Sequence, residues 1–169
     1  MSTTTETKPA EITVTREIAA SPDRLYAELI DLRQWEEWSI WSRKEDPDCE
    51  WTYEGEPGKG MRLDYHGPKI GKGYITIQEA DPSTGVEFAH FNPGQEPIQN
   101  RVQWKAAGDG KLEVTWWAAG KSQSDSISRW AATLFFPQIL ENINQRNLTR
   151  LEKAAQAKAE EPTPNDAKK

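Results

Sequence analysis

The chain has 169 residues, a mass of 19.2 kDa and a formal net charge of −6 at pH 7, with 36% hydrophobic and 28% charged residues. This length is typical of one domain with a core large enough to enclose a pocket. The acidic balance includes seven acidic against two basic residues between Trp35 and Glu54, which argues against binding to nucleic acid. No run of 18 apolar residues occurs, so no stable membrane insertion is expected.

Polar ends flank the rest of the chain. Residues 1–10 and 160–169 predict disordered tails around a single domain over residues 11–159. The first residues lack the apolar segment of a secretory signal, and the single cysteine, Cys49, cannot form an internal disulfide. These features predict a cytoplasmic protein and leave its oligomeric state open.

The first elements have clear local signals. Residues 11–19 alternate between apolar and polar positions, which predicts a strand with one buried face. Ser21-Pro22-Asp23 is typical of a helix start, because serine caps the helix and proline fits its first turn. Leucines follow at helical spacing. The Trp-rich segment over residues 35–41 then predicts a second short helix and an exit loop.

Short alternating segments occupy the chain from Cys49 to Gly120, separated by turns rich in Gly, Pro, Asn and Asp. This pattern is typical of an antiparallel meander. The side chains expected on its inner face are Trp51, Tyr53, Leu63, Tyr65, Ile75, Val86, Phe88, His90, Val102, Trp104, Leu112, Val114, Trp116 and Ala118.

The last third of the chain changes to a helical period. Residues 127–136 are apolar and compatible with a helix, and Pro137 predicts the first turn of a helix of about twenty residues. A curved sheet wrapped around this helix would close the core. The apolar stripe of the helix is expected to run through Leu140, Ile143, Asn147, Leu151 and Ala154.

Several segments match a known family in their order along the chain. The stretch ITVTREIAASPDRLYAELIDLRQWEEWS is followed by YEGEPGKGMRLDYHG, GKGYITIQEADPSTGV, LEVTWWAAG and NLTRLEK. Together they resemble the SRPBCC (START-like, pollen-allergen-like) superfamily over residues 12–152, most closely its bacterial polyketide cyclase/dehydrase-like branch. The resemblance implies an α+β helix-grip fold. That fold has a seven-stranded antiparallel sheet wrapped around a long C-terminal helix, two short helices after the first strand, and a cavity between sheet and helix.

The resemblance implies ligand binding more firmly than any reaction, because one fold carries many functions. We predict binding of a hydrophobic or aromatic small molecule, such as a lipid, a polyketide or an isoprenoid-like compound. One alternative is a polyketide cyclase, aromatase or dehydratase that uses the same cavity. Another is an adaptor of the chaperone-co-activator or coenzyme-Q-binding type, which an exposed apolar patch at Trp38, Trp41 and Trp117 would favour. No cofactor is expected.

The candidate site residues are polar or aromatic side chains carried inward with the apolar faces. Arg16 would clamp a carboxylate or phosphate, or else pair with a structural acid or reach water at the rim. His90 and Tyr65 are candidate proton donors or acceptors, or else hydrogen-bonded structural groups. Asn147 needs a partner, which is a ligand, a buried water or a neighbouring side chain. The predicted ligand-binding residues are Arg16, Trp51, Tyr53, Leu63, Tyr65, Ile75, Phe88, His90, Trp104, Trp116, Ala118 and Asn147.

The Trp residues of the inner face are either core or an aromatic wall, and two or three Trp side chains are expected to contact the cavity. The opening is expected between the long helix and the strand loops, with Asn92-Pro93-Gly94 as a lid. No metal site is expected, because Cys49, His66 and His90 do not have metal-ligand spacing.

Overall fold

The computed structural model describes residues 10–94, 96–120 and 128–159. Apart from Ala10, the expected tails lie outside these described residues. The elements are β1 (Ala10–Ile18), α1 (Pro22–Ile30), α2 (Trp35–Trp38), β2 (Glu50–Glu54), β3 (Arg62–Gly67), β4 (Gly71–Asp81), β5 (Gly85–Phe91), β6 (Ile98–Gly108), β7 (Lys111–Gly120) and α3 (Ser128–Ala159).

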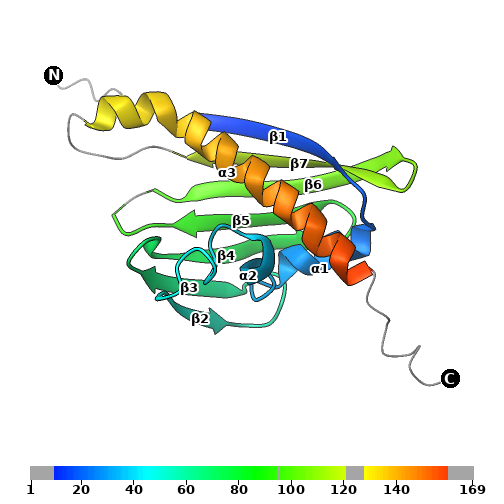
Figure 1. The fold of residues 1–169 in the computed structure, drawn as a ribbon, viewed down its shortest axis with the longest axis horizontal. Helices are drawn as coiled ribbons and strands as arrows, with labels where there is room; N and C mark the ends of the chain where they lie inside the picture. The colour runs from blue at the N-terminus through cyan, green and yellow to red at the C-terminus, as the bar shows by residue number, and fades with distance from the viewer. Residues whose placement is uncertain (1–9, 95, 121–127, 160–169) are drawn as a thin grey trace.

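One antiparallel sheet contains the seven strands, in the order β1-β7-β6-β5-β4-β3-β2. α3 runs along one face of this sheet, and α1 and α2 pack against the same helix (Figure 1). This arrangement confirms the predicted helix-grip architecture. It encloses the inner face of the sheet between strands and helices.

The start of α1 follows from its first residues. The Ser21 hydroxyl oxygen accepts a hydrogen bond from the Arg24 backbone N–H at 3.3 Å, and Pro22 occupies the first turn. Leu25 and Leu29, one turn apart, are both fully buried. The predicted cap and apolar spacing therefore fix both the beginning of α1 and the face that it turns to the core.

The strands bury alternate side chains, as the sequence pattern predicts. β7 shows this throughout: Leu112, Val114, Trp116 and Ala118 are buried, and the residues between them are half-buried. A β-bulge shifts the pairing of β4 with β5 between Ile77 and Glu79. Because the predicted inward residues of β4 precede this bulge, their phase is unaffected.

A cluster of aromatic rings forms the centre of the core. Trp35, Trp38 and Trp116 are each 1% exposed or less. The ring of Trp35 lies 4.9 Å from the rings of both Trp38 and Phe88, measured between centroids. The Trp35 indole N–H donates to the backbone oxygen of Leu29 at 3.2 Å. These rings join α2 to the middle of the sheet, so they are structural core.

The long helix differs from the expectation at its start and in its buried face. It begins at Ser128 and continues through Pro137, which was expected in its first turn. The preceding apolar residues extend the helix, and proline is then an interior residue. Ile143 and Ala154 are only half-buried. The fully buried positions follow steps of four and three, and they are Leu140, Asn144, Asn147, Leu148, Leu151 and Ala155.

None of the helices in the described ranges is long and apolar enough to span a membrane.

Candidate functional site

A cavity of about 160 Å³ lies between the sheet and α3, near the connection from β5 to β6. Most of its lining side chains are aliphatic or aromatic, and the polar ones are one imidazole and three amides. None of these described side chains is a Lys, Arg, Asp or Glu. The lining residues are Trp41, Ile75, Phe88, His90, Asn92, Ile98, Asn100, Ile139, Leu140, Ile143 and Asn144.

Trp41 reaches the cavity from the segment that follows α2, and hydrogen bonds hold that segment in place. The Ile40 backbone N–H donates to Asn147 Oδ1 of α3 at 3.0 Å. The fully buried Asp46 accepts from the backbone N–H groups of residues 69–70 at 2.8 and 3.1 Å. The wall that carries Trp41 is therefore tied both to α3 and to the turn between β3 and β4.

His90 and Tyr65 form a buried pair at one side of the cavity. The Tyr65 hydroxyl is hydrogen-bonded to His90 Nε2 and donates to Asn92 Oδ1 at 3.3 Å. The rings of Trp41 and His90 meet edge to face with centroids 4.6 Å apart. A β-carbon at Gly73 would lie 2.5 Å from the Tyr65 hydroxyl oxygen, so this position must be glycine for the hydroxyl to reach His90.

Burial keeps both members of the pair uncharged at neutral pH. Burial lowers the pKa of His90 to about 4 from its ordinary value near 6.5. The pKa of the Tyr65 hydroxyl is raised above its ordinary value, mainly by burial. The pair can therefore exchange hydrogen bonds with a ligand without adding a charge to the cavity.

The depressed pKa of His90 predicts a loss of stability in acid. The unfolded chain binds a proton at this imidazole near pH 6.5 and the folded chain only near pH 4. The stabilising contribution of this imidazole is therefore fully present above pH 6.5 and is lost as the pH falls toward 4. We measure the free energy of unfolding in urea at pH 7.5 and at pH 4.5. Between these pH values, the wild type is expected to lose about 2–3 kcal/mol more of it than His90→Gln, whose side chain does not titrate. Equal losses in the two proteins would mean that the pKa of this imidazole is not depressed in the folded protein.

Five of the predicted ligand-binding residues lie in or against this cavity. Ile75, Phe88 and His90 line it. Tyr65 is hydrogen-bonded to His90, and the ring of Trp116 packs against Phe88 with centroids 5.7 Å apart. The inward faces of β3, β4, β5 and β7 thus bring these positions together.

Other predicted residues of the inner face belong to the surrounding core. Leu63, Trp104 and Ala118 are buried but are not among the lining residues. Trp51 packs against Tyr65, with ring centroids 5.9 Å apart. These side chains support the residues that form the wall.

Tyr53 and Asn147 lie at other places. Tyr53 lies beside Glu36, and burial together with this carboxylate raises its pKa. Asn147 is fully buried and accepts the backbone hydrogen bond of Ile40, so its carbonyl holds the segment after α2. Neither residue lines the cavity.

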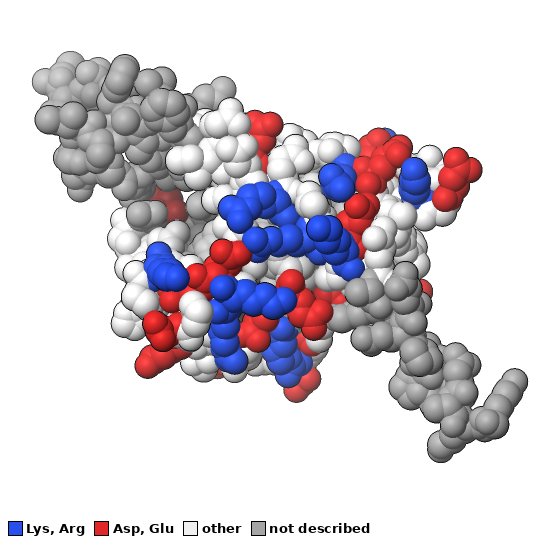
Figure 2. Space-filling view, viewed as in Figure 1, with Lys and Arg blue, Asp and Glu red and all other residues white. Residues whose placement is uncertain are grey.

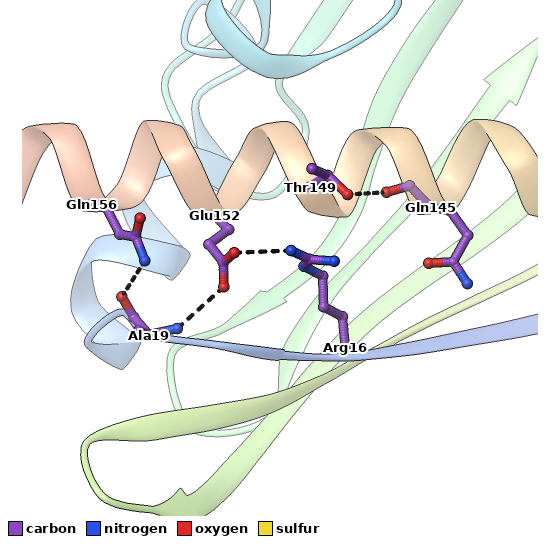
Figure 3. A network of polar contacts seen from close by, with 6 residues as sticks. All are labelled: Arg16, Ala19, Gln145, Thr149, Glu152 and Gln156. Atoms are coloured by element: carbon purple, nitrogen blue, oxygen red, sulfur yellow. Dashed lines mark hydrogen bonds and ion pairs between the residues drawn. The ribbon is translucent and has the colours of Figure 1, made fainter.

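Arg16 is paired with α3 and lies outside the cavity lining (Figure 3). Its Nη2 lies 3.0 Å from Glu152 Oε1. The other carboxylate oxygen of Glu152 accepts from the Ala19 backbone N–H at 3.4 Å, and Gln156 donates to the Ala19 carbonyl oxygen. The geometry favours the structural-acid alternative for Arg16, in which this side chain joins the end of β1 to α3.

The sequence interpretation missed most of the cavity's polar side chains, although two had a readable signal. Asn100 lies two positions before the buried Val102 on β6, so it shares the same face. Asn144 lies one turn from both Leu140 and Leu148 on α3. The lining residues absent from the predicted set are Trp41, Asn92, Ile98, Asn100, Ile139, Leu140, Ile143 and Asn144.

The expected Trp contacts and lid have mixed outcomes. Among the described Trp residues, Trp41 lines the cavity and the others do not, against an expectation of two or three. In the expected lid over residues 92–94, Asn92 contributes to the lining. Gln95 lies outside the described residues, and closure by this loop stays a prediction.

The apolar patch that would favour an adaptor is not formed by the three named Trp residues. Trp38 is fully buried, and Trp41 is half-buried in the cavity wall. Trp117 points to the opposite face of the sheet and donates its indole N–H to Glu11 at 2.5 Å. The large hydrophobic side chain that is exposed among the described residues is Ile139.

The face that carries α3 has mixed charge. Lys and Arg side chains lie next to Asp and Glu side chains across it (Figure 2). Two of the ion pairs behind this pattern are Arg150–Glu45 at 2.8 Å and Arg43–Glu36 at 3.1 Å. The acidic stretch over residues 35–54 is therefore partly neutralised, and this face offers no uniform field to a polyanion.

Within the described ranges, no group of three His, Cys, Asp or Glu side chains is placed to hold a metal ion. Cys49 is buried and His66 is exposed.

The sequence matches a known protein family over most of its length. Residues 9–156 match the model of the family described as polyketide cyclase / dehydrase and lipid transport. The chain belongs to this family. No curated protein sequence matches it.

Solved structures share the fold of this family member at low sequence identity. TTHA0849 from Thermus thermophilus is 15% identical with a TM-score of 0.68, over 90% of this chain and 100% of that one. Zhui aromatase/cyclase from Streptomyces sp. R1128 is 12% identical with a TM-score of 0.66, over 89% and 96%. SA2116 from Staphylococcus aureus, a protein of unknown function, is 8% identical with a TM-score of 0.69, over 92% and 99%. At these identities the likeness concerns the fold alone.

Proposed function

We propose that this chain binds a small hydrophobic or aromatic molecule in the cavity between the sheet and α3. The observation that carries the proposal is the lining, in which aromatic and aliphatic walls from Trp41, Phe88 and Leu140 surround a few amides and an imidazole. Binding pockets for small molecules have this composition, because apolar burial supplies affinity and a few polar groups set orientation.

The size of the cavity bears on the kind of ligand. A core cavity of roughly 150 Å³ holds one benzene-sized ring. The present volume of about 160 Å³ therefore suits one ring or a short branched chain. A longer lipid, polyketide or isoprenoid would place only one end here. Apolar burial of roughly 120 Å² would contribute about 3 kcal/mol, so single-ring probes are expected to bind weakly.

Native mass spectrometry of the freshly purified protein, followed by denaturing extraction, tests this proposal. We expect a stoichiometric hydrophobic passenger, or saturable binding of single-ring compounds when the protein is purified empty. A protein that carries no passenger and binds no such compound at millimolar concentration would contradict the proposal.

The Tyr65–His90 pair supports a second candidate, a cyclase, aromatase or dehydratase. An uncharged buried imidazole can take a proton from a carbon next to a carbonyl, and a phenol can hydrogen-bond the developing oxygen. His90 lines the cavity, and the Tyr65 hydroxyl lies behind it, hydrogen-bonded to the imidazole. Incubation of the protein with the extracted compound or a polyketone, followed by mass analysis, separates the candidates. Loss of water from the compound would favour the enzyme, and unchanged mass would favour the binder.

A further inference from the structure

Asn144 lines the cavity and carries a buried amide N–H group without a partner among the residues that the structure describes. The residue lies on the buried face of α3 and is 1% exposed. It lines the cavity, and its Nδ2 has no protein hydrogen-bond partner there. A buried donor without an acceptor is costly, so native proteins provide one from protein, water or ligand.

Several neighbouring polar groups of the cavity are already hydrogen-bonded within the protein. Asn100 Nδ2 donates to the Ile98 backbone oxygen at 3.1 Å, and Asn100 Oδ1 accepts from the Trp116 indole N–H at 3.0 Å. The Tyr65 hydroxyl is bonded to His90 and Asn92. Among the described lining residues, Asn144 Nδ2 is the buried side-chain polar atom without a hydrogen-bond partner.

The lack of charged side chains in the described lining restricts the charge of the ligand. The described lining residues include no Lys, Arg, Asp or Glu, and the imidazole of His90 is neutral at pH 7. Arg16, which the sequence predicts could hold an anion, is paired with Glu152 and does not line the cavity. An ionised carboxylate or ammonium in this cavity would lose its hydration with no opposite charge to replace it.

We propose that the ligand of this cavity is an electrically neutral compound with a carbonyl-type acceptor, which receives a hydrogen bond from Asn144 Nδ2. This inference rests on the proposed binding function and specifies its ligand class. The rings of Trp41 and Phe88 would contact the apolar part of the ligand, and the amide would fix the position of its oxygen.

Three probes of similar shape separate the need for a carbonyl acceptor from the need for a neutral ligand. Acetophenone carries a ring and a carbonyl, α-methylstyrene replaces the carbonyl oxygen by a methylene group, and benzoate carries a charge. Binding is followed at pH 7.5 by the side-chain amide resonances in two-dimensional NMR. The Asn144 signal is assigned by its loss in Asn144→Leu. In the wild type, acetophenone is expected to shift this signal, and benzoate is expected to bind at least tenfold more weakly than acetophenone.

Two variants separate the contribution of the hydrogen bond to affinity from the contribution of apolar contact. Asn144→Leu is expected to weaken the binding of acetophenone about tenfold and to leave the affinity for α-methylstyrene within about twofold of the wild type. Retained binding of α-methylstyrene also shows that the variant is folded. The matched control is Asn142→Leu, an exposed amide on the same helix, which should change neither affinity.

The outcomes distinguish this inference from the function on which it rests. Equal effects of Asn144→Leu on both neutral probes, or benzoate binding as tight as acetophenone binding, would overturn the neutral-acceptor inference and leave the binding function standing. Failure of both neutral probes to perturb cavity resonances would overturn the binding function, and this inference with it.

Discussion

Replacement of Trp35 by alanine is expected to lower the free energy of unfolding by about 3–5 kcal/mol, the usual cost of removing a large buried aromatic side chain. Trp35 is 1% exposed and packs against both Trp38 and Phe88. The substitution also leaves the Leu29 carbonyl oxygen without its indole partner. Urea unfolding followed by far-ultraviolet circular dichroism measures the change.

The matched control for this loss is Trp117→Ala. Trp117 is half-buried on the other face of the sheet, where its indole N–H meets Glu11. We expect a cost of about 1 kcal/mol there, because little apolar surface returns to water. Similar losses for the two variants would contradict the assignment of Trp35 to the centre of the core. A smaller loss for Trp35→Ala than for its control would do the same.

Ile143→Trp is expected to weaken binding of α-methylstyrene at least tenfold while the fold is kept. Ile143 lines the cavity from α3 and is only half-buried, so a larger ring can enter the free space without displacing the packed core. An indole would occupy much of a cavity of about 160 Å³. Affinity is measured by NMR titration, and folding by circular dichroism.

Gln145→Trp provides the control for this second prediction. It adds the same side chain two positions along α3, at an exposed residue. Its affinity for α-methylstyrene is expected to match the wild type. If Ile143→Trp also bound normally, the ligand would lie outside this cavity, and the proposed function would have to be placed elsewhere in the molecule.

The buried face of the sheet could be predicted because side-chain direction in a strand is a local property. Alternation alone placed Leu63, Ile75, Phe88, Val114 and Trp116 inward, and all five are buried. The bulge in β4 could have reversed this assignment, but it lies beyond Ile77.

Helix boundaries and faces were predicted less well for a physical reason. Ser21 and Pro22 act within one turn, so the start of α1 was readable from them. Pro137 allows a helix start but does not require one, and the helix of the structure already begins at Ser128. The stripe through Ile143 and Ala154 was also offset from the face that α3 buries.

Short stretches of sequence were enough to predict the order of the elements and the inward side chains of the strands, because each depends on residues close together in the chain. The family was recognisable from the order of several such stretches. Which polar groups meet depends instead on packing between distant segments. Arg16 pairs with Glu152, 136 positions away, and Tyr65 meets His90 across two intervening strand pairings. Asn144 lines the cavity beside residues of β5 and β6 because α3 packs with that face toward the sheet, an arrangement set by contacts between distant segments.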